Sequence, residues 1–440
     1  MLNRQDAKAL IEKIISSTKY YAVAVLTASE QGTTRFANSE ISQNVTTVDG
    51  KMMLTLYDGK KQASCTTNAL MESGMEQLVK DAEYMMLAVP EGEFAAFEFS
   101  KEEVAERTYN SSLANAFGAS QRAAYIKEGV AYLEPGYTAA GALTLTSNVM
   151  AIGESGGGFR YANYANVTFN TVVSHEDGTD GAGECCSYTT VPDIIGTFKK
   201  AQATAKAARN PVEPRLGGFT VVLSPNAFGD LLYFTASSLN AKSVDMGISF
   251  ARGKLGQKVF GENLTMTDDV NHPELMPLPF DQEGNPRRVV PLIEKGVVKA
   301  FLYDNKTAAK DGVESTGHSI TTPFGGGAYP RNVVVEAGDM SMDEIIANTE
   351  NGIFINELHY TNFVNSRNLQ ITGLTRNGTF LIENGKLTKP VATVRFTESM
   401  LDAFNNITAI SKEREVVAGY TGANLVPGVR IENFHFTSKP

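Results

Sequence analysis

The spacing of apolar residues changes from a helical to a strand period within the first 60 residues. In residues 4–17, Leu10 and Ile14 lie four residues apart with Ala9 beside them, which places them on one face of a helix. The next runs, YYAVAVLTAS, TTRFANSEISQNVTT and KMMLTLYD, alternate apolar and polar residues and are separated by EQG, DG and DGK, which are typical of turns. We therefore predict one helix followed by an antiparallel meander.

Two more helices are predicted before the strand period returns. Residues 69–86 and 101–124 carry apolar residues at helical spacing. Ser100 followed by Glu103 has the spacing of a capping box at the start of the second of these helices. The first part of the chain thus combines helices with an antiparallel sheet.

The strand period returns after about residue 131, and the pattern changes again near residue 215. GALTLTSNVMAIGES and FRYANYANVTFNTVVSH alternate, and a helix over 191–210 ends at Asn210-Pro211. Beyond 215, short strands separated by Gly, Asn and Pro dominate, and the predicted helices are short: 226–238, 341–348 and 397–404. We predict an α+β fold with an N-terminal α+β domain at 1–214, a sub-boundary near 118–130, and a C-terminal mostly-β domain at 215–440.

Composition limits the classes of function. The 440 residues are 42% hydrophobic and 20% charged, enough for more than one core, because single cores stop growing near about 250–300 residues. The net charge of −10 disfavours direct binding to nucleic acid, since the phosphate backbone would be repelled. Cys65, Cys185 and Cys186 are too few, and two of them too close in sequence, for a disulfide framework.

The N-terminal sequence bears on localisation. MLNRQDAKALIEKIISS has neither a long apolar core nor a small-residue cleavage site, and no later run is apolar for the length of a membrane span. We therefore predict a cytoplasmic protein with no membrane partner.

Three local patterns are candidates for ligand sites. GISFARGK (247–254) differs from a phosphate-binding loop, because five residues separate its glycines and Leu255 follows the lysine. FGGGAYP (324–330) fits a mobile connection and a substrate loop equally well. In HEDGTDGAGECC (175–186), the glycines and Asp-Gly pairs favour a flexible acidic turn over an ion site. The side chains there that could bind a metal are His175, Glu176, Asp177, Asp180, Glu184, Cys185 and Cys186.

Several short motifs follow one another in the second half of the chain. They are the acidic pair at 268–269, the D-x-E-G-x-P-x-R element in FDQEGNPRR, the run LIEKGVVKAFLYD, the turn AAKDGVESTGH, and the IENGK hairpin. In this order, over about 215–440, they resemble the TldD/PmbA family, also called modulators of DNA gyrase. RFANSEISQ and DGKKQAS fit the other half of the family more loosely. Read from their chemistry alone, Asp281, Glu283 and Arg287 hold a turn by charge-assisted hydrogen bonds.

The resemblance implies a zinc site in one branch of the family. In TldD-type subunits, a helix after the VVL strand carries HExxxH, in which two histidines bind zinc and the glutamate is the general base, and a cysteine near the C-terminus is a further ligand. At those positions this chain has Tyr233, Phe234 and Ser238, and no cysteine follows Cys186. Phenol, phenyl and hydroxymethyl groups do not make a zinc site. We therefore expect no catalytic residue, metal or cofactor in this chain.

The chain therefore resembles the PmbA/TldE branch, which lacks the zinc motif. That resemblance implies a non-catalytic subunit of a cytoplasmic metallopeptidase complex, with a zinc-bearing TldD-type homologue as partner and unfolded or extended peptides as substrates. In isolation it would form a homodimer. Tyr233 and Phe234 are expected to pack in the core or an interface.

Two other functions stay open. One is a DNA gyrase-associated regulator, as the family's older name suggests, although a chain of charge −10 shows no basic stripe. The other is a self-standing hydrolase in which His318, in STGH, or His359, in LHY, activates a hydroxyl group. A lone histidine in a turn is more often a structural residue.

Overall fold

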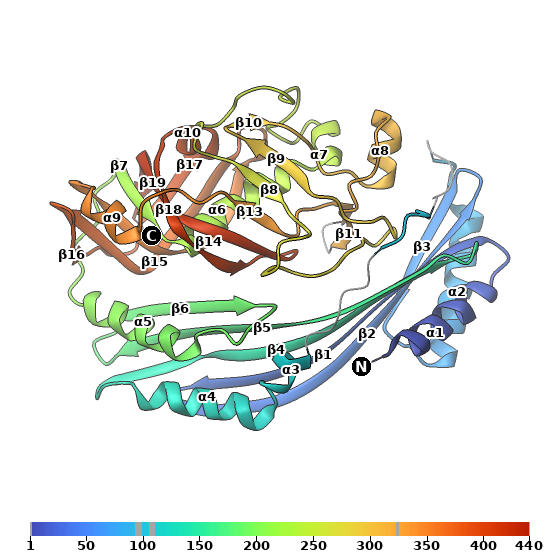
Figure 1. The fold of residues 1–440 in the computed structure, drawn as a ribbon, viewed down its shortest axis with the longest axis horizontal. Coiled ribbons are helices and arrows are strands. Elements are labelled where there is room, and N and C mark those ends of the chain that lie inside the picture. The colour runs from blue at the N-terminus through green and yellow to red at the C-terminus, as the bar shows by residue number, and fades with distance from the viewer. Residues whose placement is uncertain (1, 93–98, 105–110, 323–324, 440) are drawn as a thin grey trace.

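Two β-sheets dominate the chain. The computed structural model describes residues 2–92, 99–104, 111–322 and 325–439. One sheet uses strands between residues 21 and 187, and the other uses strands between 217 and 438 (Figure 1). The α+β class predicted from the sequence is confirmed. The predicted boundary at 214/215 lies in the connection between the sheets, and as a division into domains it stays a prediction.

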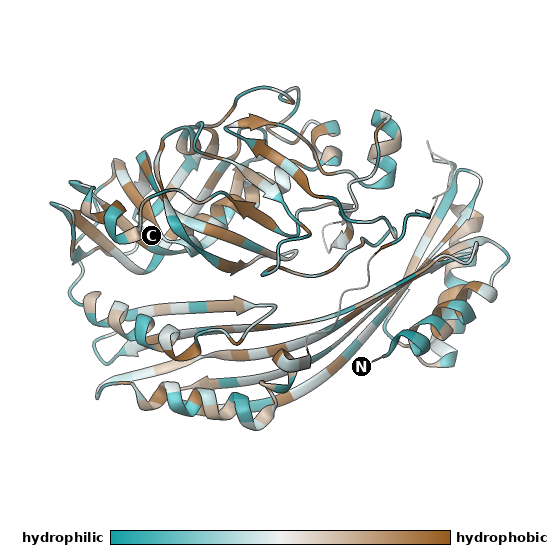
Figure 2. Ribbon diagram, in the orientation of Figure 1, coloured by the Kyte–Doolittle hydropathy of each residue, from teal (hydrophilic) through white to brown (hydrophobic). Residues whose placement is uncertain are grey.

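The first sheet has six strands in the order β3-β2-β1-β4-β5-β6, and every neighbouring pair is antiparallel. The strands are β1 Tyr21–Ala37, β2 Glu40–Asp58, β3 Lys61–Thr67, β4 Tyr137–Glu154, β5 Phe159–His175 and β6 Asp180–Ser187. Several are long for a globular protein, in which strands usually have three to ten residues. Figure 2 shows apolar and polar residues alternating along them, as expected where the two faces pack differently.

Helices cover the two ends of this sheet separately (Figure 1). At one end lie α1 Arg4–Ser16 and α2 Glu72–Ala88, and at the other lie α3 Ser111–Asn115, α4 Ala119–Ala131 and α5 Ile194–Ala207. Ile11 and Ile14 of α1 pack with Leu26 at the first end. Phe198 of α5 packs with Phe36 and Phe169 at the second. In the described part of the chain, no helix is long and apolar enough to cross a membrane.

The predicted turns at EQG and DG are wrong. Both lie inside continuous strands, where Gly32 pairs with Thr46 and Gly50 with Ala28. The glycines are there because side chains approach the backbone closely: a Cβ at Gly32 would collide with the Arg122 guanidinium, and one at Gly50 with Leu70. The β1–β2 turn is instead at Asn38 and Ser39, which both have positive φ. The turn predicted at DGK is confirmed between β2 and β3.

The helix predicted over 101–124 is partly wrong. Residues 101–104 are not helical, and 105–110 lie outside the described residues. Ser100 does not cap a helix; its hydroxyl accepts from the Glu102 amide. Arg160 and Arg288 hold this segment extended, because Arg160 donates to the carbonyls of Ser100 and Glu102 at 2.9 and 2.7 Å, and Arg288 binds the Glu102 carboxylate through two contacts.

The second sheet has eleven strands and mixed direction. They are β7 Gly217–Leu223, β8 Met266–Asp268, β9 Val290–Glu294, β10 Val297–Val298, β13 Val333–Val335, β14 Asn351–Asn365, β15 Gln370–Glu383, β16 Lys386–Pro390, β17 Arg395–Ser399, β18 Ile407–Ala418 and β19 Ala423–Ser438. A separate pair is formed by β11 Ser319–Thr322 and β12 Gly325–Ala328.

The helices predicted at 226–238, 341–348 and 397–404 are confirmed as α6 Pro225–Ser238, α9 Met342–Ala347 and α10 Met400–Asn405. Two short helices, α7 Ala241–Asp245 and α8 Asn305–Asp311, were not predicted. The largest apolar cluster of the molecule surrounds α6.

An apolar cluster joins the two sheets. Val25 and Ile152 of the first sheet pack with Leu278, Phe280 and Leu425 of the second half of the chain. The run YAVAVL in β1 is therefore buried on both faces, against helices on one side and the second sheet on the other. This contact fixes the position of the β-rich half relative to the long strands.

Replacing Arg122 should destabilise the fold. Its side chain is 2% exposed and donates to Thr34 Oγ1, the Phe117 carbonyl and Asn44 Oδ1 at 3.1, 2.7 and 2.9 Å. Arg122→Ala removes all three bonds at once, and we expect a loss of about 2–4 kcal/mol in the free energy of unfolding, measured by urea titration. The exposed Arg35→Ala is the control and should change it by less than about 0.5 kcal/mol. A loss below about 1 kcal/mol for Arg122→Ala would show that the bonds are replaceable.

Candidate functional site

Helix α6 carries Tyr233, Phe234 and Ser238, the positions at which the family resemblance leads us to expect the zinc motif of TldD-type proteins. It starts where β7 ends, because the Ser224 side chain accepts from the Ala227 amide and Pro225 occupies the first turn. Ser224 Oγ also donates to the carbonyl of Asn356 at 2.5 Å, which ties the start of the helix to β14. Ten of its 14 residues are buried, so α6 is a core helix with a narrow exposed side.

The three motif positions are occupied by packing residues. The Tyr233 ring lies 4.8 Å from that of Tyr420 and 5.6 Å from that of Phe234. Phe234 meets Phe363 edge to face at 4.8 Å. Ser238 is buried, and its hydroxyl donates to the carbonyl of Phe234 at 2.8 Å. None of these groups supplies an imidazole, carboxylate or thiolate, so the residues present do not fit a zinc ion.

A cavity of about 390 Å³ lies beside α6. It is bounded by β6 of the first sheet and by α6 and β14 of the second half, so it opens where the two sheets meet. Its lining is mostly polar, with Leu358 as the one aliphatic side chain among the residues that line it. The others are Glu184, Asn226, Asp230, Glu357, His359, Tyr360, Thr361, Asn362 and Tyr420. Tyr360 and Tyr420 are strongly exposed, so their rings form an accessible rim.

Three carboxyl groups make this cavity acidic. Burial, reinforced by the charge of Glu357, raises the pKa of Glu184 to about 7. Glu184 as a whole is exposed, so water screens part of this effect. Burial, followed by the charges of Glu184 and Glu357, raises the pKa of Asp230 to about 7. The pKa of Glu357 is also raised by burial, and Asn377 opposes that rise by donating to it at 2.7 Å. The cavity therefore gains negative charge as the pH passes through neutrality.

The sequence indicates some of these residues but does not show that they meet in one cavity. Glu184 stands out only as part of the segment 175–186. Asp230 precedes Tyr233 by about one helical turn and belongs to no motif. Glu357 is 127 residues beyond Asp230, and only the pairing of β14 beside β7 brings it to α6. No spacing rule in the sequence could have shown this.

His318 is not available to a substrate. It is fully buried, with Nδ1 2.8 Å from the carbonyl of Thr316 and Nε2 3.1 Å from Asp268 Oδ1. The Asp268 carboxylate also accepts from Arg287 at 2.8 Å. Burial acts to raise the pKa of Asp268, but His318 and Arg287 outweigh it and the pKa is lowered. The geometry is that of an internal ion cluster.

The D-x-E-G-x-P-x-R element forms a turn, as its chemistry predicted. Asp281 accepts from the amides of Glu283, Asn285 and Ser319 at 2.9, 2.9 and 3.0 Å. Glu283 accepts from the Asn305 amide at 2.8 Å, and burial, together with Asp281, raises its pKa well above the usual range. Asp281 and Glu283 therefore hold the main-chain amides of this turn and of its neighbouring segments in place.

His359 lies on the wall of the α6 cavity. Its Nε2 is 2.7 Å from Arg376 Nη1, and its ring packs against Tyr360. A histidine that contacts a guanidinium through this nitrogen is poorly placed to take a proton from a hydroxyl group.

The segment 175–186 is a hairpin connection that runs into β6. Asp177 lies 3.0 Å from His175 Nδ1 and 2.6 Å from Arg209 Nε. Burial raises the pKa of Cys185 to about 11 and of Cys186 to about 12, which keeps both as thiols near neutral pH. In the residues that the structure describes, no three His, Cys, Asp or Glu side chains are arranged to hold a metal ion.

Two other segments singled out in the sequence contribute no residue to the lining of the α6 cavity. Of the glycine-rich segment 324–330, Gly325–Ala328 forms strand β12, and residues 323–324 lie outside the described part. In 247–254, residues between α7 and β8 form turns.

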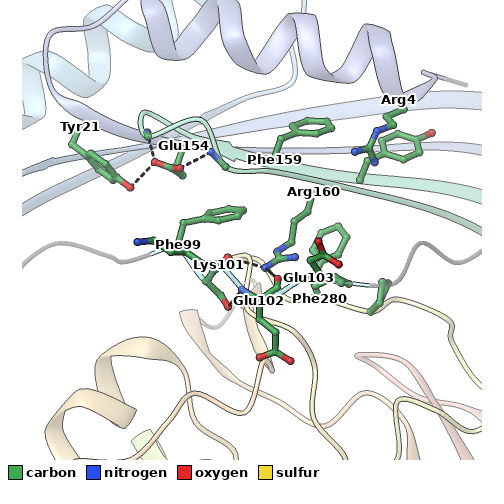
Figure 3. Close-up of a pocket in the computed structure, with 16 residues that line it drawn as sticks. Arg4, Tyr21, Phe99, Lys101, Glu102, Glu103, Glu154, Phe159, Arg160 and Phe280 are labelled. Carbon is green, nitrogen blue, oxygen red and sulfur yellow. Dashed lines mark hydrogen bonds between the residues drawn. The ribbon is translucent and has the colours of Figure 1, made fainter.

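A larger cavity, about 980 Å³, lies between α1 and the second half of the chain (Figure 3). In it, Glu154 accepts from Tyr21 Oη at 2.7 Å and from the Gly158 amide at 2.6 Å. Arg160 stacks on Phe99 and donates to the carbonyl of Gly284 at 2.6 Å. Both charged groups are engaged within the protein, and Arg160 joins the two halves of the chain, so we place the candidate site at α6.

Comparison with known proteins agrees with this geometry. Residues 216–438, just over half of the chain, match the PmbA/TldA metallopeptidase C-terminal domain. A metalloprotease from Methanothermobacter thermautotrophicus is 27% identical over 272 residues, 58% of this chain and 57% of that protein. A metalloprotease TldD homologue from Buchnera aphidicola is 27% identical over 244 residues, 52% of this chain and 49% of its own length. The match thus spans about half the length of these relatives.

A solved structure extends the similarity over the whole fold. TldE from Thermococcus kodakarensis superposes with a TM-score of 0.85 at 20% identity, covering 98% of this chain and 99% of its own. At this identity the likeness concerns the fold. The match of residues 216–438 to the C-terminal domain model shows that this chain belongs to the PmbA/TldD family.

Proposed function

We propose that this chain is the zinc-free, non-catalytic subunit of a TldD/TldE-like metallopeptidase complex that acts on unfolded or extended peptides in the cytoplasm. The observation that carries the proposal is the content of α6: Tyr233, Phe234 and Ser238 occupy the HExxxH positions and pack inside the protein. The similarity to a TldD homologue and to the fold of TldE supports a role beside a zinc-bearing partner.

The cavity beside α6 is the part of such a subunit that would contact the peptide substrate. Its exposed tyrosine rim and polar wall offer contacts that do not depend on a particular peptide sequence. Its carboxyl groups would favour peptides that carry positive charge. In the complex, this chain would supply one wall of a peptide cleft while the partner supplies zinc and the general base.

The two alternatives have less support. A self-standing hydrolase would need a reachable base, but His318 is buried and His359 is held by Arg376. A gyrase-associated regulator that binds DNA directly is disfavoured by the charge of −10.

Peptidase activity should require the partner. We expect cleavage of an unstructured peptide when this chain is mixed with the HExxxH homologue from the same source, and loss of that cleavage with a chelator that removes zinc. This chain alone should be at least about 100-fold slower, because no base or metal is present at the aligned positions. Cleavage by this chain alone at the rate of the mixture, resistant to the chelator, would replace the subunit model with the independent hydrolase.

Zinc binding should be absent and hard to restore. Elemental analysis of the purified chain should find far less than one zinc per chain. The triple variant Tyr233→His, Phe234→Glu, Ser238→His should still bind zinc poorly, because no cysteine ligand follows Cys186 and the helix face lacks partners that would orient the new histidines. Stoichiometric zinc in the natural chain, lost on Tyr233→Ala, would contradict the proposal; retention after Tyr233→Ala would point to another site.

The acidic cavity should make stability depend on pH. In the folded chain the pKa of Asp230 is about 7, so between about pH 4 and 7 the unfolded carboxyl is ionised while the folded one holds its proton, and stability falls as the pH rises. Asp230→Asn removes this penalty and should raise Tm by about 2 °C at pH 8 with little change at pH 4. Exposed Asp339→Asn is the control. Equal effects of Asp230→Asn at both pH values would disprove the electrostatic origin.

A further inference from the structure

A cavity of about 260 Å³ lies between the first sheet and the second half of the chain. Strands β1, β2, β4 and β5 supply one wall, and Leu278, Gln282 and Arg331 supply the other. Figure 1 shows the long strands of the first sheet passing beneath the second half of the chain. Among the described residues, none lines both this cavity and the one at α6, so the two are separate places in the fold.

The wall formed by the first sheet carries a polar row across four strands. The row consists of Asp49, Ser29, Asn148 and Tyr164, each directly opposite the next on the neighbouring strand. Directly paired residues place their side chains on the same face of a sheet, and so do residues two apart in one strand. Lys51, two residues beyond Asp49 in β2, therefore lies on this face as well and also lines the cavity.

This polar row interrupts an otherwise apolar face. On the same face, the paired residues Val25 and Ile152 pack against Leu278 of the second half. Val25 and Ser29 are four residues apart in β1, so the face changes from apolar to polar within two side chains. The second half of the chain still covers the polar row, because Leu278 lines the cavity too. Polar groups that are covered in this way need hydrogen-bonding partners.

Arg331, on the opposite wall, is held by its main chain. Its amide donates to Asp268 Oδ2 at 2.6 Å, and its carbonyl accepts from the Ala423 amide at 3.0 Å. The residue is half-buried. Among the described residues, its guanidinium donates only to Met276 Sδ, at 3.6 Å, and a thioether sulfur is a weak acceptor. Within those same residues, Nε is buried and has no hydrogen-bond partner.

The positive charge of Arg331 has no counter-ion in the part of the chain that the structure describes. The Asp268 carboxylate is paired with Arg287, and His318 lies beside it. Arg331 binds Asp268 only through its main-chain amide. Because a half-buried charge without a partner is unfavourable, the guanidinium is available to an anion that enters the cavity.

Two further donors line the cavity. Burial raises the pKa of Tyr164, and the charge of Arg331 opposes that rise, so the phenol lies near the guanidinium. In the described residues the Tyr164 hydroxyl makes no hydrogen bond. Gln282 Oε1 accepts from the Thr321 amide at 2.8 Å, which leaves the NH2 group of Gln282 as a donor at the cavity. The lining therefore suits a ligand rich in acceptor atoms.

We propose that this cavity binds a carboxylate group, held by Arg331 and by the donors of Tyr164 and Gln282. The charged side chains of the lining are two cations, Arg331 and Lys51, and one anion, Asp49, which leaves one positive charge for a ligand. The two oxygens of a carboxylate match the fork of a guanidinium. A phosphate group carries about −1.5 to −2 charges at pH 7, more than the lining offsets.

The carboxylate can have two sources, the C-terminus of a peptide or a small organic acid. Asp49 and Lys51 are exposed, which leaves that side of the cavity open to either ligand. Neither source depends on the proposed peptidase role, because the ligand chemistry follows from the lining alone.

Isothermal titration calorimetry of the full chain tests the class of ligand. The probes are N-acetyl-trialanine, its C-terminal amide, butyrate and inorganic phosphate. We expect saturable binding of a carboxylate, with phosphate at least about tenfold weaker. Tighter binding of the peptide acid than of butyrate, lost in the amide, identifies a peptide C-terminus, and tighter binding of butyrate identifies a small organic acid. No carboxylate-dependent binding, or phosphate bound as tightly as the better carboxylate, would overturn the proposal.

Substitution of the arginine tests the location of the site. Arg331→Gln removes the guanidinium and keeps both main-chain bonds, and should raise the dissociation constant of the carboxylate at least about tenfold. The Tm of the ligand-free chain should stay within about 2 °C, because the charge has no counter-ion to lose. Arg367→Gln makes the same change at an exposed position outside this lining and should leave the dissociation constant unchanged. Unchanged binding by Arg331→Gln, or an equal loss with Arg367→Gln, would contradict this site.

Two variants of exposed residues test the charge balance and leave Arg331 in place. Lys51→Gln should weaken carboxylate binding, and Asp49→Asn, which removes a negative charge, should tighten it about threefold. Added salt should weaken binding and reduce the difference between these variants. Carboxylate binding that Asp49→Asn leaves unchanged or weakens would overturn the assignment of an anionic ligand.

Discussion

The buried carboxylate of Asp268 is the interaction on which the β-rich half depends. It accepts from Arg287 and from the amides of Arg331 and Asn332, and His318 lies beside it. These partners come from three segments, none of which is strand β8, where Asp268 itself lies. Because an unpaired buried carboxylate is costly, the strand β8, the turn at 280–288 and the segments at 318 and 331–332 must assemble together. Leu278 and Phe280, which pack on the first sheet, belong to the same assembly.

This constraint explains why Asp268, Arg287 and His318, which most resemble a catalytic cluster in residue type, have a structural role. Arginine, aspartate and histidine in close contact form catalytic sites when substrate can reach them, but Asp268 and His318 are fully buried. The Asp268 carboxylate is paired with Arg287 and holds the amides of Arg331 and Asn332 in place. The acids that line the α6 cavity, Glu184, Asp230 and Glu357, belong to none of the motifs that carry the family resemblance.

Local sequence was sufficient for the elements and insufficient for their pairing. The period of apolar residues located α1, α2, α5 and α6, because each helix buries one face or more. Turn chemistry failed at Gly32 and Gly50, where glycine serves the close approach of Arg122 and Leu70. Those contacts come from helices and loops far along the chain, and no window of sequence contains them. The extended segment at 99–104 was missed for the same reason, since Arg160 and Arg288 hold it.

The candidate site likewise has one part that could be predicted from the sequence and one part that could not. The side chains that α6 carries could be read directly, because the sequence gives the residue at each position. The acidic cavity could not, because Glu184, Asp230 and Glu357 are contributed by a strand of the first sheet, a helix and a strand of the second. Their raised pKa values result from burial and mutual repulsion, which exist only after both sheets have formed.

Packing also explains how α6 is stable with no polar metal ligand at these three positions. A zinc-bearing helix must present polar ligands, and the desolvation they suffer is offset by the ion. Here Phe234 against Phe363 and Tyr233 against Tyr420 fill that place with aromatic contacts, each pair worth about 0.5–1.5 kcal/mol beyond burial. The helix therefore needs no ion for its stability. Placing histidines at these positions would remove the aromatic contacts before any ligand geometry existed to replace them, so the proposed loss of zinc and the packing of α6 are linked.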